Sequence, residues 1–464
     1  MFTWMRHWPR HALAAFAATL AVLAFGAWRT WALINAQPHP TVDTIAQLNA
    51  LALEGQPEGE NAWDAYVAAY DEAFPNADAL PREQQPNGFM RRSEIYRGAW
   101  EDTDRTPLIE WLDEHRALLD RVDEISQLER FVPVFKHGAT TAPDGREFAS
   151  LVLVRSSDQI DWRAIDTLQN LNISQMRVSA EAGDWDDVAA RMRTGLRIAI
   201  QRSKWPRSMD LLRMISSYAL MRSAVSFILN EYDVPTPACQ AMLDALDAWD
   251  VDMDLVLRRV GEATSIEYVD AIQWLHTSSG VPLLTEWDNE FNSLPMSIRI
   301  LIERPLRPWA PGDAHARDVA QRYIAHFERT LTLTHKDFQA NHHMYRGHKH
   351  HKALMVVGMT AAAGMKTIRA LESFHAALRV MLRLEMYFNE MGHWPDSLLD
   401  AMSEAEARDP FSGEMFEYEL APNDQSGRPY ELRIGWYSSA RDANVVNRPR
   451  QPLQMQPARR FNPN

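Results

Sequence analysis

Cysteine is nearly absent from this sequence, and positive charge is in the minority. Among the 464 residues there is one cysteine, Cys239, so the chain cannot form an intramolecular disulfide or a zinc site built on several thiolates. We expect Cys239 to be a small buried apolar residue. The formal net charge of −14 argues against nucleic acid as a partner, because the phosphate backbone would repel the body of the protein.

The short motifs of common enzyme classes are also missing. There is no Gly-x-Gly-x-x-Gly fingerprint, P-loop, His-Glu-x-x-His or Gly-x-Ser-x-Gly sequence. Asp250, Asp252 and Asp254 match the start of a calcium-binding EF-hand loop, but Leu255 stands where that loop requires glycine and Gly261 where it requires glutamate. We interpret these aspartates as solvated residues and a helix cap. The sequence predicts a non-catalytic protein without a cofactor.

An apolar run near the N-terminus is the clearest positive signal. Arg6 and Arg10 precede an uncharged stretch at 12–28, and a second apolar stretch at 31–34 extends it past Arg29. The apolar length is about 23 residues, enough to span a bilayer. We therefore predict that residues 1–36 form a membrane anchor with one transmembrane helix. The alternative is a cleaved signal peptide that ends near residue 36.

Charge on either side of this run predicts its orientation. Residues 37–81 contain eight acidic residues and no Lys or Arg, whereas the basic residues lie before the run. The positive-inside rule places the N-terminus in the cytoplasm and the body outside it. We expect a single-pass protein of the inner (cytoplasmic) membrane with an extracytoplasmic body.

Residues 37–345 carry apolar side chains at the three- and four-residue spacing of amphipathic helices. Asp184 is the expected N-cap of one helix, and the turn that contains it resembles a tetratricopeptide hairpin, without any repeat at the period of that family. We predict a mainly α fold, an irregular helical stack. The expected helices begin at residue 41 and then cover 61–70, 108–122, 162–182, 184–200, 209–229, 235–249, 252–276 and 314–339.

Residues 346–442 are expected to form a small α+β cap. A buried helix at 353–365 precedes a long amphipathic helix at 366–391, and Gly392 suits a left-handed C-cap. Pro395 is expected to open a second short helix. Two alternating runs then predict a β-hairpin whose apolar face packs on the long helix, because a hairpin alone is only marginally stable in water. That face consists of Phe416, Tyr418, Leu420, Tyr430, Leu432, Ile434 and Trp436.

Short motifs in this cap resemble a known family. The sequences Gly-His-Trp-Pro-Asp-Ser-Leu at 392–398, Asp-Pro-Phe-Ser-Gly at 409–413 and Trp-Tyr-Ser-Ser at 436–439 resemble the C-terminal part of major pseudopilins of type II secretion. The same ending, with a Trp- and Tyr-containing helix near residue 63, is similar to that of uncharacterised bacterial membrane-anchored helical proteins. Asp442 is the one carboxylate where pseudopilins often hold calcium, so the resemblance implies a packed cap without that ion.

Six of the sixteen histidines lie between His335 and His351, and neutral imidazoles at this density can bind Zn, Cu or Ni. Four Lys and Arg residues surround them, and Gly347 interrupts any fixed helical spacing. A solvated basic connector, or one that binds an anionic lipid headgroup, is the alternative. We predict no specific metal site. The candidate ligands, should a site exist, are His342, His343, His348, His350 and His351.

The remaining residues, 443–464, contain four prolines, four arginines and no acidic residue, and are expected to be a disordered basic tail. Taken together, these patterns predict a cell-envelope interaction or scaffold protein that contacts the membrane through its N-terminal helix and has a protein partner in the envelope. A metal-binding protein that uses the histidine cluster is the alternative. A component related to pilus-like secretion is a third hypothesis.

Overall fold

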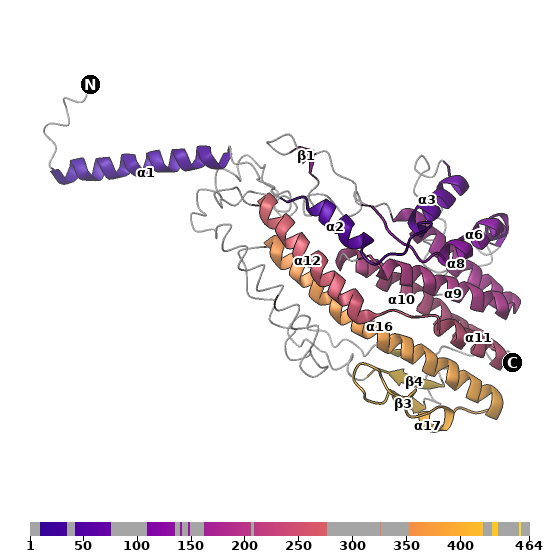
Figure 1. Ribbon diagram of the computed structural model, residues 1–464. Coiled ribbons are helices and arrows are strands. Elements are labelled where there is room, and N and C mark those ends of the chain that lie inside the picture. The colour runs from indigo at the N-terminus through magenta and orange to yellow at the C-terminus, as the bar shows by residue number, and fades with distance from the viewer. Residues whose placement is uncertain are drawn as a thin grey trace.

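The computed structural model confirms that the protein is mainly α-helical, with a small antiparallel sheet near its C-terminus (Figure 1). Its helices form a stacked body, and helix α1 lies apart from the other labelled helices. The structure describes residues 10–34, 42–75, 109–134, 140–141, 147–148, 162–205, 208–275, 325, 352–420, 429–434 and 454–455.

Helix α1 (Arg10–Ile34) covers the N-terminal apolar run as one continuous helix. Within the described part of the chain, no helix is both long and apolar enough to cross a membrane. The expected helix is therefore present, whereas the spanning role that we predicted for it is not supported.

The next three elements are α2 (Thr44–Leu53), α3 (Ala62–Ala73) and α6 (Arg116–Ser126). One helix was expected at 108–122, but the chain has a helical turn at 109–114 and then α6, with a break at His115. The His115 ring nitrogen lies 2.7 Å from the Trp111 carbonyl oxygen. In a continuous helix the Trp111 carbonyl oxygen would accept the backbone N–H of His115. Here the His115 side chain contacts that oxygen, and the backbone N–H donates to Leu112 O instead.

Five long helices form the middle of the body, close to their predicted positions: α8 (Arg163–Ala182), α9 (Trp185–Ser203), α10 (Ser208–Glu231), α11 (Thr236–Leu246) and α12 (Met253–Leu275). Gly183 ends α8 in the left-handed region at φ +72°. Asp184 caps α9 as predicted, since its carboxylate accepts the Asp187 N–H at 3.2 Å. Helix α9 packs against α8, α10 and α11.

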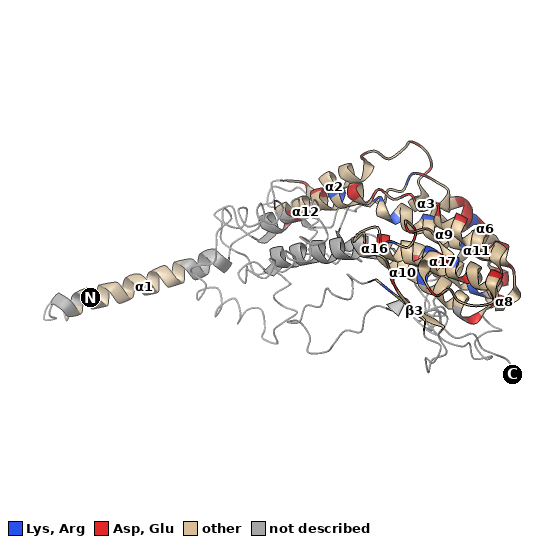
Figure 2. Cartoon of the chain, turned by 90° about the horizontal axis from the view of Figure 1, so that it is seen from below, with Lys and Arg blue, Asp and Glu red and all other residues tan. Residues whose placement is uncertain are grey.

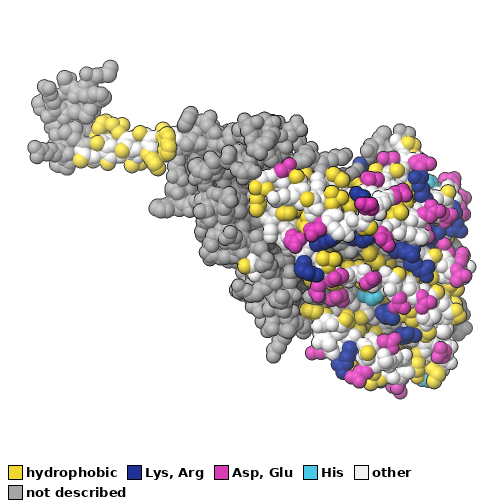
Figure 3. Space-filling view, viewed as in Figure 1, with side chains coloured by type: hydrophobic (Ala, Val, Ile, Leu, Met, Phe, Trp, Pro, Cys, Tyr) yellow, Lys and Arg dark blue, Asp and Glu magenta, His cyan; other side chains and the backbone are white. Residues whose placement is uncertain are grey.

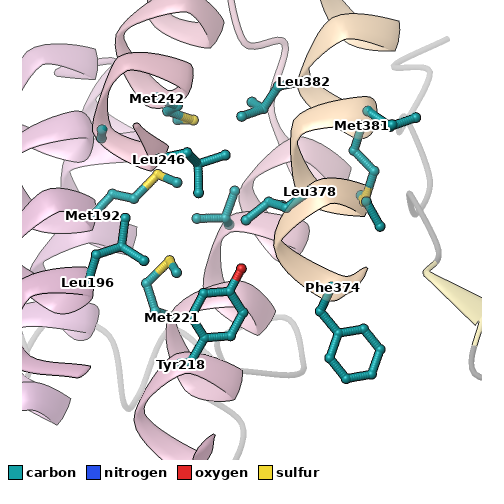
Figure 4. Close-up of a cluster of buried hydrophobic side chains, with 14 of the residues drawn as sticks. Met192, Leu196, Tyr218, Met221, Met242, Leu246, Phe374, Leu378, Met381 and Leu382 are labelled. Atoms are coloured by element: carbon teal, nitrogen blue, oxygen red, sulfur yellow. The ribbon is translucent and has the colours of Figure 1, made fainter. Parts of the chain in front are cut away.

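Helix α16 (Lys352–Met391) runs through 40 residues without a break and joins the two helices that we expected at 353–365 and 366–391. It packs against α10, α11 and α12. Leu378 of α16 contributes to the same buried cluster as Leu246 of α11 and Tyr218 of α10, each at most 1% exposed (Figure 4). Gly392 ends the helix at φ +76°, which confirms the predicted left-handed cap.

The C-terminal cap begins with α17 (Leu398–Ala401), which starts later than predicted. Ser397, not Pro395, defines its first turn. The Ser397 hydroxyl accepts the Leu399 N–H at 3.3 Å, and the Asp400 carboxylate accepts the Ser397 N–H at 2.9 Å. This reciprocal capping satisfies N–H groups that a helix start leaves unpaired.

Strands β3 (Glu417–Leu420) and β4 (Tyr430–Arg433) form the predicted hairpin, with Tyr418 opposite Leu432 and Leu420 opposite Tyr430. Tyr430 and Leu432 are at most 1% exposed and belong to the same core cluster as α16. The ring of Trp394 lies between Phe388 of α16, at 4.6 Å, and Tyr430, at 4.9 Å. Leu420 is 36% exposed, so its predicted burial is wrong. Trp436 lies outside the described residues.

Three short strands lie where no strand was expected. Strands β1 (Thr140–Thr141) and β2 (Glu147–Phe148) pair with each other between the expected helices at 108–122 and 162–182. Strand β5 (Gln454–Met455) pairs with β4 and lies in the segment predicted to be disordered. Composition alone predicted disorder for this segment. The backbone N–H and C=O groups on the free side of β4 can pair with an extended segment whatever its composition, which explains the difference. Of the predicted helix at 314–339, only Ala325 lies within the described residues.

Candidate functional site

The candidate metal ligands His342, His343, His348, His350 and His351 lie outside the described residues, so their arrangement stays a prediction. In the described part of the chain, no group of three or more His, Cys, Asp or Glu side chains could hold a metal ion. Asp252, one of the three EF-hand-like aspartates, accepts the Leu255 N–H at 2.8 Å at the start of α12. This contact confirms its interpretation as a helix cap.

The most prominent surface feature is the exposed apolar surface of α1, which is visible in Figure 3 as yellow side chains on the projecting helix. The exposed fractions are 50% for Leu20, 69% for Val22, 63% for Leu23, 55% for Phe25 and 61% for Trp28. These five residues lie within nine positions of one helix. Contiguous exposed apolar surface of this kind marks contact with a membrane or with another protein. We refer to these five side chains as the α1 apolar surface.

The chain reaches the body through α2, which is fastened to α12 by two hydrogen bonds. The Thr44 hydroxyl donates to the Asp270 carboxylate at 2.6 Å, and both side chains are buried. At the other end of α2, the Arg259 guanidinium donates to the Glu54 carbonyl oxygen at 2.6 Å. Gly55 takes φ +68° beside that guanidinium. Helix α2 is therefore bonded to α12 at both of its ends.

A buried arginine joins the three helices α8, α9 and α10. Arg202 of α9 is 2% exposed; it donates to the Asp166 carboxylate at 2.7 Å and to the Ser217 hydroxyl at 2.6 Å. Its guanidinium lies 5.6 Å from the centre of the Trp162 ring. Arg213 of α10 also reaches Asp166, at 3.2 Å. A buried charge is costly unless it is paired in this way, so this cluster acts as a structural cross-link.

A second arginine, Arg191 of α9, links α9 to α6. It lies 3.1 Å from the Asp187 carboxylate, 3.4 Å from Asp120, and donates to the Leu119 carbonyl oxygen at 3.1 Å. The Asn172 amide of α8 donates to the Arg191 carbonyl oxygen at 2.7 Å. These contacts join α9 to α6 and α8.

The pair most suited to proton chemistry consists of His375 on α16 and Tyr218 on α10, whose ring nitrogen and hydroxyl oxygen lie 3.2 Å apart. The pKa of His375 is lowered to about 4, mainly by burial and also by the charge of Arg379, whereas Asp247 acts in the opposite sense. Burial raises the pKa of Tyr218. The imidazole is therefore neutral near pH 7, and its tautomer decides which of the two groups donates.

The surroundings of this pair argue for a structural role. The His375 ring stacks on Trp249 with ring centres 5.8 Å apart, and the adjacent surface carries the ion pair between Arg379 and Asp247. Tyr218 is fully buried, so a substrate cannot reach its hydroxyl without movement of α16. The contact holds α16 against α10 and against the chain that follows α11.

Sequence patterns did not single out Arg191, Arg202 or His375. A signal was present for Arg202, because Ile198, four residues before it on α9, and Trp205, three residues after it, are both apolar and buried. A charged residue inside such an apolar stripe indicates a buried ion pair. The partners of these residues come from other helices, and the sequence contains no comparable sign of which helices those are.

Neither family models, nor curated proteins, nor solved structures yield a match to this chain. The resemblance of the C-terminal cap to pseudopilins therefore remains a prediction from short motifs. The described features that bear on function are the α1 apolar surface and the buried clusters of the body.

Proposed function

We propose that this chain is a non-catalytic interaction or scaffold protein of the cell envelope, attached to the cytoplasmic membrane by α1. In this proposal the N-terminus lies in the cytoplasm and the helical body lies outside it. The observation that carries the proposal is the α1 apolar surface, which stands apart from the body in Figures 1 and 3.

The gain from burying this surface supports attachment to a membrane. Removing one large apolar side chain from water is worth about 1.5–3 kcal/mol, and the α1 apolar surface contains five that are at least half exposed. Burying them in lipid favours attachment whether α1 crosses the bilayer or lies along its surface. Trp28, near the end of the helix, suits the boundary between lipid and water.

The body supports a scaffold role over a catalytic one. The charged clusters around Arg191 and Arg202 tie α6, α8, α9 and α10 together through hydrogen bonds and ion pairs between these helices. A stack that is cross-linked in this way holds its ends in fixed positions. Such rigidity suits a protein that positions partners near the membrane.

Flotation with phosphatidylcholine vesicles tests the attachment. We expect the full chain, diluted from detergent into vesicles, to float with them, and the variant Val22→Glu/Leu23→Glu to stay in the dense fraction. A charged residue at the centre of a membrane helix costs roughly 2.5–3.5 kcal/mol. The matched control is Leu255→Glu/Val269→Glu, which adds the same charges at two positions on α12 that are each 40% exposed.

The control should float like the wild type, because α12 belongs to the body. Equal flotation of the α1 variant would contradict the proposal. A dense fraction for the wild type as well would show that the α1 apolar surface does not attach the chain to lipid.

A further inference from the structure

Strand β3 forms one edge of the C-terminal sheet, in which the strands are ordered β3-β4-β5. On one side it pairs with β4 from Glu417 to Leu420; among the described residues no strand pairs with its other side. The chain just before β3 is already bonded, since the Phe416 N–H donates to Ala407 O at 3.0 Å. The open edge is therefore β3 itself. An edge strand can accept an extended segment of another protein through its backbone groups.

The outer face of this edge carries unbalanced negative charge. Glu417 and Glu419 are exposed, and neither has an ion-pair partner among the described residues. Across the β3–β4 pair, Glu417 lies opposite Arg433 and Glu419 lies opposite Glu431, and Arg433 already forms an ion pair with Glu431. Carboxylates directly opposite each other on a sheet repel. A cation on an added strand, next to Glu417 and Glu419, would relieve that repulsion.

The other face of the edge is apolar. Leu420 is 36% exposed, and Tyr418 is half-buried with its hydroxyl bonded to Pro395 O at 2.8 Å. Side chains of a strand alternate between the two faces. An added strand would therefore place one set of side chains beside the glutamates and the other set over Leu420.

The charge of the whole cap points to the same kind of partner. Residues 390–420 contain nine Asp and Glu residues and one Arg. A field of one sign attracts a partner of the opposite sign and disfavours one of the same sign. The cap also lies at the end of α16 away from α1 in both Figure 1 and Figure 2, where a membrane-attached body would present it to other proteins.

We propose that the open edge of β3 binds an extended segment of a partner protein in which basic and apolar residues alternate. This proposal rests on the interaction role proposed above, and it assigns that role to the open edge of β3. A second copy of the chain fits less well, because two β3 edges side by side would bring four glutamates together. At the opposite edge of the sheet, Gln454 and Met455 of the C-terminal segment pair with β4 as β5.

Binding of a synthetic peptide of eight alternating Lys and Val residues to the full chain in detergent tests this proposal. We expect Glu417→Gln/Glu419→Gln to weaken binding roughly two- to thirtyfold, since two exposed ion pairs with the peptide are lost. The matched control, Glu124→Gln/Asp186→Asn, removes two exposed carboxylates from α6 and α9 and should leave the affinity nearly unchanged. Hydrogen exchange should slow at the amides of β3 when the peptide is added.

Three results would overturn the proposal. Equal weakening in both variants would show attraction to acidic surface in general. Binding without slower exchange in β3 would place the peptide elsewhere. A dimer whose β3 amides are protected without peptide would assign the edge to a second copy. Vesicle flotation of Glu417→Gln/Glu419→Gln should match the wild type, so failure here is distinguishable from failure of membrane attachment.

Discussion

Arg202 lies beneath the Trp162 ring, with its guanidinium 2% exposed and bonded to Asp166 and Ser217. Removing one partner from such a cluster leaves an uncompensated charge in the interior, which costs more than the pair contributes. Residues of this kind therefore specify which helices are neighbours and how those helices are positioned along one another. They account for the ordered contact of α9 with both α8 and α10.

His375 makes stability depend on pH. Its pKa is about 4 in the folded protein because of burial, and about 6.5 when unfolded. Between these values the unfolded chain binds the proton more tightly, so the contribution of neutral His375 is complete above pH 6.5 and lost as the pH falls to 4. We expect this residue to account for a loss of roughly 3 kcal/mol in the free energy of unfolding between pH 7 and pH 4.

Denaturant titrations at pH 7, 5.5 and 4 measure this loss. Carboxylates also titrate in the range, so the quantity to compare is the pH dependence of the wild type minus that of His375→Gln. The variant lacks the imidazole and should be less sensitive to acid by about the same 3 kcal/mol. Parallel pH profiles for the two proteins would show that the histidine is not buried against Tyr218 and Trp249.

At the scale of elements, α16 and the C-terminal cap form one packed unit. The ring of Trp394 fills the space between Phe388 on the helix and Tyr430 on β4, while Leu432 and Ile434 enter the same core cluster. The apolar side chains of the hairpin are therefore buried against α16 and Trp394. The hairpin could not bury them by itself, which agrees with the marginal stability of isolated hairpins.

A double-mutant cycle tests this packing. Tyr430→Ala should cost roughly 3–5 kcal/mol, as for other buried aromatic residues. Combined with Trp394→Ala, the two losses should fall short of additivity by about 0.5–3 kcal/mol, because contacting residues share the contact that is lost. The control pair is Tyr430→Ala with Leu48→Ala, a fully buried residue of α2 in the other core cluster. That pair should be additive in guanidinium denaturation, and additivity in both pairs would contradict the contact.

At the scale of the whole molecule, local signals predicted the helices well. Three- and four-residue spacing located α8 to α12, and glycines at 183 and 392 marked helix ends through their positive φ. These features depend on neighbouring residues, so the sequence alone contains them. The same holds for the hairpin, where alternation predicted the apolar face that Tyr430 and Leu432 bury.

The differences arise from individual side-chain contacts, which apolar periodicity does not report, and from contacts between distant parts of the chain. Apolar spacing predicted one helix through His115, but the contact of the His115 side chain with Trp111 O interrupts it. The predicted start of the short helix was Pro395, but Ser397 caps α17 and sets its start. The exposure of Leu420 depends on how far the cap extends over β3. The α1 apolar surface was predictable from composition, but the open edge of β3 followed only from the strand order.

Topology is the last property of the whole molecule to be tested, and the charge asymmetry around α1 makes the prediction. Arg6 and Arg10 precede the helix, whereas residues 37–81 carry eight acidic residues and no basic one, so the body should lie outside the cytoplasm. A reporter that is active only there, fused after Asn61, should be active, and the protein should keep its N-terminus and stay with membranes after an alkaline wash. An inactive reporter would reverse the orientation. A mature N-terminus near Gln37 would instead identify a cleaved signal peptide, because α1 would then be absent from the mature protein.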